Sequence, residues 1–274
     1  MRKLLPLLAL LFALPLAAAD DPCAGAYASL NATLWQQTSA EYDAITRQVY
    51  ASAQRNLEKM LADGIPDPLG RPPAIILDAD ETVIDNSTFQ ASLLKARKVY
   101  STDAWKAYAT NGFARPIPAA LDFLKWAASQ KVEIYYVTNR AVDAKPELDE
   151  KPRLLGTLTR YGYPMADAKH VLLKGEKPEW TSDKSSRRAF VAANNQLLML
   201  FGDDLNDFVN TAGKTVAERR KIVADNASKL GTSWYLLPNP SYGSWETALG
   251  ADTGKSDCGL QQKIDQLRVD KEWH

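Results

Sequence analysis

The sequence is poor in the residues that carry histidine- and cysteine-based chemistry. It has only two histidines and two cysteines among 274 residues. His274 is the last residue and His170 begins an apolar run, so neither supports a reaction that depends on a catalytic histidine. The chain also lacks an excess of charge, because 33 basic residues balance 33 acidic ones. This balance gives no reason to expect a nucleic-acid polymer or an anionic membrane as partner.

The longest apolar run lies at the N-terminus and is short. Arg2 and Lys3 precede the 13 residues from Leu4 to Leu16, and three alanines follow, ending at Ala19. A membrane-spanning helix needs roughly 20 apolar residues. The pattern is that of a secretory signal peptide, residues 1–19, cleaved after Ala19. We therefore expect an exported protein, periplasmic or secreted, without a stable membrane anchor. An uncleaved interfacial anchor is the alternative.

The two cysteines, Cys23 and Cys258, lie near the two ends of the mature chain. In an oxidising compartment an even number of cysteines favours a disulfide, so we expect this pair to be bonded. Two unpaired thiols and a lipid attached to Cys23 are the alternatives. The charged pair Asp20-Asp21 and Pro22 stand where lipid attachment needs small residues, which disfavours the lipid.

The chain divides into a helical N-terminal segment (20–72), a core (73–246) and a C-terminal tail (247–274). Apolar residues at near-helical spacing between Tyr27 and Leu61 predict one or two amphipathic helices. The core then alternates helical stretches with short apolar runs, which suit strands buried on both faces. The runs are 74–77, 132–137, 171–173, 197–201 and 234–237. This alternation predicts a doubly wound, Rossmann-like α/β parallel sheet.

Three helices of the core have recognisable ends. Pro118 is suited to open one, and Gly162 to close another. Thr215 and Glu218 form the sequence pattern of a capping box, which predicts a helix that begins there and ends at Gly231.

Carboxylates follow directly after two of the predicted strands. Asp78 and Asp80 follow the first, and Asp203, Asp204 and Asp207 follow the fourth. Ligands of open α/β sheets bind beyond the carboxyl ends of the strands, so these side chains should meet at one edge. Close like charges raise one another's pKa and cost stability unless a cation binds them. Mg²⁺ takes oxygen ligands and bridges to phosphate, so we expect a Mg²⁺ site.

Four strings of residues together resemble a known family. They are ILDADETVIDNS, YVTNR, GDDLNDF and NPSYGSWE, between Ala74 and Glu246. They resemble the phosphohydrolases of the haloacid dehalogenase (HAD) superfamily, and within it the class C acid phosphatases, bacterial secreted or outer-membrane enzymes active on nucleotides and related phosphomonoesters. These relatives usually carry a lipidated N-terminal cysteine; the residues before Cys23 do not fit this pattern, so we do not expect that anchor here.

The resemblance implies a role for each site residue. Asp78 would be the nucleophile, and Asp80 would protonate the leaving group and then activate water. Thr138 would hold a phosphoryl oxygen, with Asn139 in support, and Lys184 would neutralise developing charge. Asp78, Asp203 and the backbone carbonyl of Asp80 would ligate Mg²⁺, and Asp207 would orient these ligands.

Two of these positions leave alternatives open. Other basic residues compete with Lys184 for its role: Lys174, Lys177, Arg187 and Arg188. Asp204 stands where the resembling enzymes usually carry Asn, and we interpret it as pointing to solvent rather than adding a ligand.

The superfamily inserts a small cap between its first two motifs, which corresponds here to residues 87–117. The insertion supplies Phe89, Tyr100, Trp105 and Tyr108. We expect Trp105, together with Tyr242 of the late string, to clamp an aromatic ring of the substrate, since base–aromatic stacking is worth roughly 1–3 kcal/mol.

The sequence therefore predicts an exported, Mg²⁺-dependent acid phosphatase that hydrolyses small phosphomonoesters, in particular nucleoside 5′-monophosphates, through an aspartyl phosphate. A phosphotransferase that uses alcohols and a catalytically silent binding protein on the same fold are the rivals. The presence of Asp78 disfavours the silent protein. The sequence leaves open whether the protein forms a homodimer.

Overall fold

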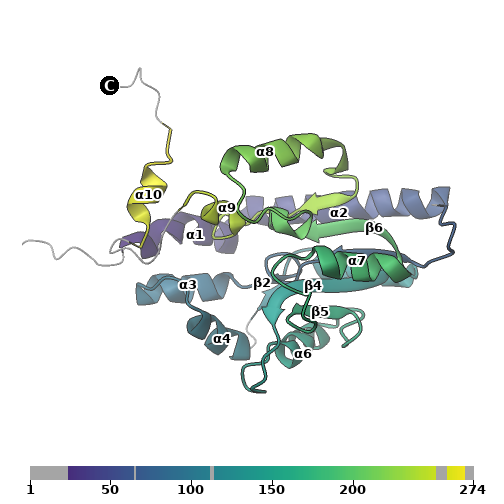
Figure 1. Ribbon diagram of the computed structural model, residues 1–274, viewed down its shortest axis with the longest axis horizontal. Helices are drawn as coiled ribbons and strands as arrows, with labels where there is room; N and C mark the ends of the chain where they lie inside the picture. Colours follow the sequence, from purple (N-terminus) through teal and green to yellow (C-terminus); the bar gives the residue numbers. More distant parts are fainter. Residues whose placement is uncertain (1–23, 65, 112–113, 251–257, 269–274) are drawn as a thin grey trace, which may run out of the picture.

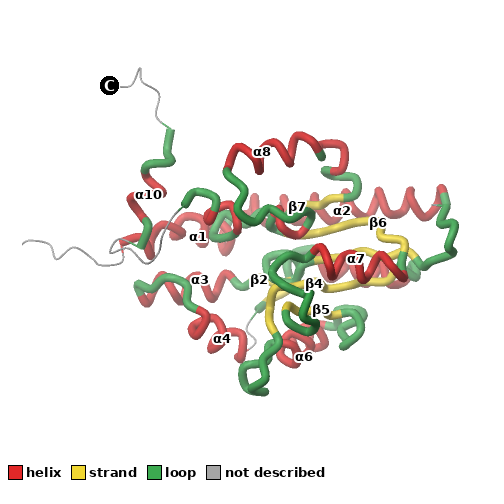
Figure 2. The backbone as a smooth tube through the Cα atoms, viewed as in Figure 1, coloured by secondary structure: helices red, strands yellow, loops and turns green. Residues whose placement is uncertain are grey.

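The computed structural model describes residues 24–64, 66–111, 114–250 and 258–268, and shows a parallel sheet between helices (Figures 1 and 2). Its five strands run in the order β5-β4-β1-β6-β7. They are β1 (Pro73–Leu77), β4 (Glu133–Ala141), β5 (Val171–Lys174), β6 (Gln196–Gly202) and β7 (Trp234–Leu236). Every neighbouring pair is parallel. The predicted doubly wound α/β fold is confirmed, and each of the predicted runs forms a strand.

The two faces of the sheet bury two separate cores, because successive side chains of a strand point to opposite faces. On one face, Ile75 and Leu77 of β1 pack with residues of helices α2 (Ala40–Asp63), α5 (Ala120–Ser129) and α6 (Lys151–Tyr161). On the other face, Ala74 and Ile76 pack with Val191 of α7 (Ser185–Asn194). Continuous apolar strands are what a sheet covered on both faces requires.

The N-terminal segment is helical, as predicted, and packs onto the core. It contains η1 (Ala24–Ser29), α1 (Leu30–Thr38) and the long helix α2, whose N-cap Ser39 accepts a hydrogen bond from the backbone N–H of Tyr42. Tyr50 of α2 is 1% exposed and its ring stacks on Phe201 of β6, with 5.8 Å between the ring centres. The segment is thus part of the same hydrophobic core as the sheet.

The inserted cap lies between β1 and α5 in the sequence. It consists of β2 (Ile84–Asp85), α3 (Ser87–Ala96), α4 (Thr102–Asn111) and β3 (Arg115–Pro116), with β2 and β3 paired antiparallel. Helix α3 packs against α1 and η1, so the cap and the start of the N-terminal segment lie side by side at one end of the molecule (Figure 1).

Helix α8 (Val216–Asp225) begins as predicted, with a capping box between Thr215 and Glu218. Its predicted end at Gly231 is wrong. The helix stops at Asp225, and a short turn, η3 (Ala227–Lys229), follows before Gly231. Asn226 and Gly231 both make turns here, and Gly231 has the positive φ of 70° that glycine adopts without strain.

The remaining helices are η2 (Leu205–Asp207), α9 (Ser244–Thr247) and α10 (Leu260–Ile264). Among the described residues no helix is both long and apolar enough to cross a membrane. The predicted signal peptide and Cys23 lie outside the described residues, so the predicted disulfide stays a prediction, although Cys258 is buried at 6% exposure.

Candidate active site

Three carboxylates meet where β1 and β6 end. Asp78 follows β1 and Asp203 follows β6, and these strands are hydrogen-bonded neighbours. Asp207 reaches the same place from η2. One carboxylate oxygen from each of the three lies within 4.8 Å of the others. Of the five Asp residues expected at this edge of the sheet, Asp78, Asp203 and Asp207 therefore come together in one cluster.

Gly202, directly before Asp203, makes the approach of Asp207 possible. A Cβ added at Gly202 would lie 2.2 Å from Oδ2 and 2.4 Å from Cβ of Asp207. The Asp207 side chain therefore packs directly over the backbone of the strand end. Only glycine leaves room for it.

The electrostatics of the cluster favour a cation. Burial raises the pKa of Asp78 to about 7, despite the opposing effect of Lys184, and the charges of Asp207 and Asp80 add to the rise. Burial and the neighbouring carboxylates also raise the pKa of Asp203 well above its ordinary range. Three oxygen donors in a small buried volume, each destabilised as an anion chiefly by burial, are suited to a hard divalent ion such as Mg²⁺.

Lys184 bridges two of these carboxylates. Its Nζ donates to Oδ1 of Asp78 and to Oδ1 of Asp207, both at 2.6 Å, and the residue is 3% exposed. The structure thus places Lys184, rather than its competitors, against the expected nucleophile. Arg188 donates instead to the backbone carbonyl of Asp207 at 3.0 Å.

Asp80 lies apart from the three-carboxylate cluster and is held by two other side chains. Arg140 donates from Nε to Oδ2 at 3.0 Å and from Nη2 to Oδ1 at 2.7 Å, and Asn86 donates from Nδ2 to Oδ1 at 2.7 Å. Among the described residues, the Asp80 carboxylate is therefore not part of the group able to bind a metal together. The backbone-carbonyl role expected for Asp80 is compatible with this.

Thr138 and Asn139 lie in β4, directly after its apolar residues. Thr138 is 1% exposed, and its Oγ1 accepts the backbone N–H of Arg140 at 3.1 Å, so its hydroxyl proton is available to a ligand. Arg187 holds both residues in place, because its guanidinium donates to the backbone carbonyl of Thr138 and, at 2.7 Å, to Oδ1 of Asn139. Burial lowers the pKa of the Arg187 guanidinium to about 10.

The late loop, residues 239–244, binds the carboxylate loops at three points. Asn239 donates from Nδ2 to Oδ2 of Asp203 at 2.8 Å. The hydroxyl of Tyr242 donates to Glu81, which is fully buried. Burial, with the nearby charge of Asp80, raises the pKa of Glu81 to about 8.

The third point corrects the interpretation of Asp204. Its carboxylate does not point to solvent, because Oδ2 accepts the backbone N–H of Ser244 at 2.5 Å and Oδ1 accepts the Ser244 hydroxyl. Oδ1 also accepts the backbone N–H of Asn206 at 2.9 Å. The local sequence, Asp204 followed two positions later by Asn206, does not reveal that the partner is Ser244, 40 positions away.

The N-terminal segment supports the catalytic loop directly. The hydroxyl of Tyr50 donates to the carbonyl of Thr82 at 2.6 Å, and Gln36 of α1 donates to Asp85 at 3.1 Å. Thr82 in turn donates from Oγ1 to Oδ1 of Asp203 at 3.2 Å.

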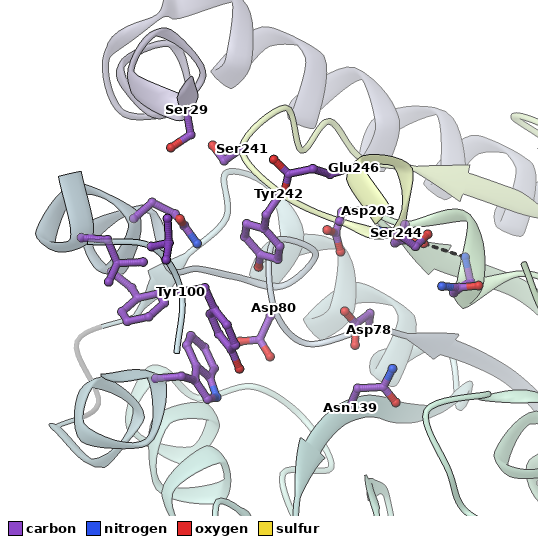
Figure 3. A pocket seen from close by; sticks show the side chains of 18 of the residues that line it. Ser29, Asp78, Asp80, Tyr100, Asn139, Asp203, Ser241, Tyr242, Ser244 and Glu246 are labelled. Atoms are coloured by element: carbon purple, nitrogen blue, oxygen red, sulfur yellow. Dashed lines mark hydrogen bonds between the residues drawn. The ribbon is translucent and has the colours of Figure 1, made fainter. Parts of the chain in front are cut away.

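A cavity of about 570 Å³ leads from the carboxylates to the surface. Figure 3 shows Asp78 and Asp80 at one end, Tyr100 and Tyr242 facing the middle, and Ser29 toward the other end. Trp105 and Phe89 also line it, so three of the four cap aromatics share this space with Tyr242, and Tyr108 is not among the residues that line it. Tyr100 is 59% exposed, whereas Phe89 is 2% exposed and packs edge-on against Trp105.

Sequence reasoning missed several residues of this site. They are Glu81, Asn86, Arg140, Glu150, Arg187 as an anchor, Asn239 and Ser244. Five of them stand inside the strings ILDADETVIDNS, YVTNR and NPSYGSWE, so the sequence marked their positions but gave no sign of their hydrogen-bond partners.

Comparison with known proteins gives one consistent result. Residues 17–245 match the family described as HAD superfamily, subfamily IIIB (Acid phosphatase). The fold is similar to the class C acid phosphatase from Bacillus anthracis, at 35% identity and a TM-score of 0.80, over 90% of this chain and 100% of that chain. A second structure of that enzyme, with tungstate bound, has the same identity and coverage and a TM-score of 0.81.

Proposed function

The chain belongs to the acid phosphatases of HAD subfamily IIIB and is a phosphomonoesterase, and we propose that it works through a phospho-aspartate on Asp78 with Mg²⁺ as cofactor. The observation that carries the mechanism is the position of Asp78. Its carboxylate lies at the end of the cavity, and one of its oxygens accepts from Lys184 at 2.6 Å. A tetrahedral oxyanion, tungstate, binds to the similar B. anthracis enzyme, which supports a phosphate site in this family.

In the first step, a carboxylate oxygen of Asp78 attacks phosphorus and the bond to the ester oxygen breaks. Asp80, two residues along the same turn, gives its proton to the departing alkoxide, which leaves as an alcohol. Thr138 offers its hydroxyl to a phosphoryl oxygen, and the ammonium of Lys184, which contacts Asp78, offsets the negative charge that develops on the phosphoryl group.

In the second step, Asp80 is a carboxylate and takes a proton from water. The water oxygen attacks phosphorus, the bond between phosphorus and Asp78 breaks, and inorganic phosphate and a protonated Asp80 result. The same carboxyl thus serves as acid and then as base, and the two-residue spacing from Asp78 keeps it close to one phosphoryl group.

Mg²⁺ would be held by Asp78, Asp203 and the backbone carbonyl of Asp80, and would supply positive charge to the phosphoryl oxygens. Asp207 would orient this set, because its carboxylate is fixed by Lys184 and by the backbone N–H of Asp204 at 3.0 Å.

For the substrate we propose nucleoside 5′-monophosphates and similar aromatic phosphates. The cavity of about 570 Å³ is of the size that takes a small organic ligand. Trp105 and Tyr242 line it as ring contacts, and the exposed ring of Tyr100 joins them. Small aliphatic phosphates offer no flat surface to these rings.

The same proposal includes export after cleavage near Ala19 and a disulfide between Cys23 and Cys258. Support comes from the N-terminal pattern of charge and apolar residues and from the even number of cysteines. Peptide mass spectrometry of periplasmic protein under non-reducing conditions checks both, since the mature N-terminus and the linked peptides appear in one experiment. Two freely alkylated cysteines, or a lipid on Cys23, would contradict this part.

Asp78→Asn tests the mechanism, because an amide is a poor nucleophile and a weaker metal ligand. We expect kcat to fall to background while thermal unfolding shows a folded protein, and we expect no labelled phospho-enzyme. Activity above a few percent of wild type would refute the covalent mechanism. Product analysis with an added alcohol distinguishes hydrolysis from phosphate transfer, because transfer yields the alcohol's phosphate ester.

A further inference from the structure

We propose that Arg140 is the positioning residue of Asp80, and that Trp105 of the cap holds Arg140 in place. The inference rests on the proposed function, in which Asp80 is the acid and base. It assigns a task to a residue of β4 that neither binds the expected metal nor faces the expected nucleophile.

The first observation is the contact between the two side chains. The guanidinium meets the Asp80 carboxylate side-on, with Nε donating to both oxygens at 3.0 and 3.2 Å and Nη2 to Oδ1 at 2.7 Å. Arg140 is 5% exposed, and an arginine fork that engages both carboxylate oxygens fixes the plane of the carboxyl. Asn86 completes the set by donating to Oδ1 of Asp80 and approaching Nη2 of Arg140 with its own oxygen at 3.4 Å.

The backbone of β4 is shaped to deliver this side chain. Thr138 pairs with Leu173 and Ala141 pairs with Lys174, so two residues of β4, Asn139 and Arg140, bulge out between consecutive positions of β5. A bulge bends a strand and changes the direction of its side chains, and is a common feature next to active sites. A hydrogen bond from the backbone N–H of Arg140 to the side-chain Oγ1 of Thr138 holds the bulge in shape.

The cap covers the guanidinium from the other side. The charge centre of Arg140 lies 5.0 Å from the ring centre of Trp105, which is a cation–π contact. The indole N–H of Trp105 donates to Oε1 of Glu150 at 2.6 Å, and Oε2 of Glu150 accepts the backbone N–H of Ala141 at 2.7 Å. The ring is therefore tied to the residue that follows Arg140.

These contacts join the cap to the acid–base group. Helix α4 carries Trp105 and also lines the substrate cavity, so the position of the cap determines where the Arg140 fork points and how the Asp80 carboxyl faces the leaving group. Direct phosphate binding by Arg140 is the competing role. It is disfavoured because Nε and Nη2 are both directed to Asp80 and only Nη1 is left for a second anion.

The leaving group separates the two roles. Nitrophenolate departs without a proton, whereas benzyl alcohol needs one, and both substrates carry a ring of similar size. With Mg²⁺ present, we expect Arg140→Gln to lower kcat/KM for benzyl phosphate at least about 10-fold more than kcat/KM for 4-nitrophenyl phosphate. General acid–base catalysis contributes a rate enhancement of roughly 10²- to 10⁴-fold, and this difference would be part of it. With 4-nitrophenyl phosphate a burst of nitrophenolate should appear, since the second step also uses Asp80.

Three further variants keep the test decisive. Arg140→Lys retains charge without the fork, so it should show the same dependence on the leaving group even if Arg140→Gln folds poorly. Trp105→Phe keeps an aromatic ring but loses the hydrogen bond to Glu150. It should show the same dependence on the leaving group, but to a smaller extent. Trp126→Phe, whose ring packs on Phe123 away from the site, is the control and should behave as wild type.

Equal losses of kcat/KM on both substrates in the Arg140 variants would overturn the proposal and indicate phosphate binding or a purely structural role. That outcome is distinct from failure of the proposed function, which would show as activity in Asp78→Asn.

Discussion

The Asp204 carboxylate binds Ser244 through both the backbone N–H and the hydroxyl of that residue, and so joins the loop after β6 to the late loop. Asp204 is the immediate neighbour of Asp203, a member of the three-carboxylate cluster. The late loop also holds Asp203 through Asn239. The two loops therefore form one unit around the expected metal, and the position of each depends on the other.

We expect Asp204→Ala to destabilise the protein, because it leaves three donors without their acceptor. The loss should be about 1–3 kcal/mol, the cost of unsatisfied hydrogen-bonding groups. Asp204→Asn should lose less, since its amide oxygen still accepts. Urea unfolding measures both, and Asp225→Ala on exposed α8 is the control. A loss in Asp204→Ala no larger than in the control would show that the contact contributes nothing.

We expect Gly202→Ala to lower activity strongly, since the new Cβ would fall 2.2 Å from Oδ2 of Asp207 and displace that side chain from Lys184. Calorimetric titration should show weaker Mg²⁺ binding by the same variant. Gly156→Ala is the matched control, because a Cβ there meets nothing within 4 Å and helix α6 favours alanine. Normal kinetics in Gly202→Ala would mean that Asp207 is free to move without consequence.

Mg²⁺ should stabilise the protein more at about pH 7.5 than at about pH 5. In the metal-free protein the pKa of Asp78 is raised from 3.8 to about 7, so between these values the folded state binds more protons than the unfolded state. The contribution of Asp78 to the stability of the metal-free protein is therefore fully present below pH 3.8 and is lost as pH rises through about 7. Bound metal removes this penalty. Thermal unfolding with Mg²⁺ or a chelator measures the effect, and an equal gain at both pH values would contradict it.

The ring contacts can be tested at Tyr242 without disturbing Arg140. Tyr242→Phe keeps the ring and loses the bond to Glu81, whereas Tyr242→Leu loses both. Relative to Tyr242→Phe, we expect Tyr242→Leu to lower kcat/KM for nucleoside monophosphates roughly 5- to 150-fold, corresponding to 1–3 kcal/mol of stacking, and to leave glycerol phosphate nearly unchanged. Relative to wild type, Tyr100→Ala should likewise lower kcat/KM for nucleoside monophosphates and leave kcat/KM for glycerol phosphate nearly unchanged. Parallel losses on both substrates would assign the rings to packing.

The sheet could be predicted from sequence because a strand buried on both faces has to be apolar throughout, and its end is marked by the first polar residue. Leu77 followed by Asp78, and Gly202 followed by Asp203, are such ends. The clustering of the carboxylates follows from strand order and needs no side-chain detail. The end of α8 was placed too late because Asn226 stops the helix as a C-cap, a role that asparagine fills less regularly than glycine.

The partners of the site residues could not be predicted, because they depend on distances through space between segments far apart in the chain. Arg140 is 60 positions from Asp80, and Tyr242 is 161 from Glu81. Nothing in the local sequence distinguishes a bound guanidinium or carboxylate from a solvated one. Asp204 illustrates the error, since a second acidic residue in a turn is usually exposed.

The contacts of helix α2 link an early segment of the chain to one that is synthesised much later. Asn56 of α2 donates at 2.6 Å to the carbonyl of Gly231 and to the hydroxyl of Tyr235, 175 and 179 positions later. The helix is synthesised early, yet these partners are synthesised near the end of translation. We therefore expect no independently folded N-terminal intermediate, and a protease-sensitive nascent chain until β7 is available.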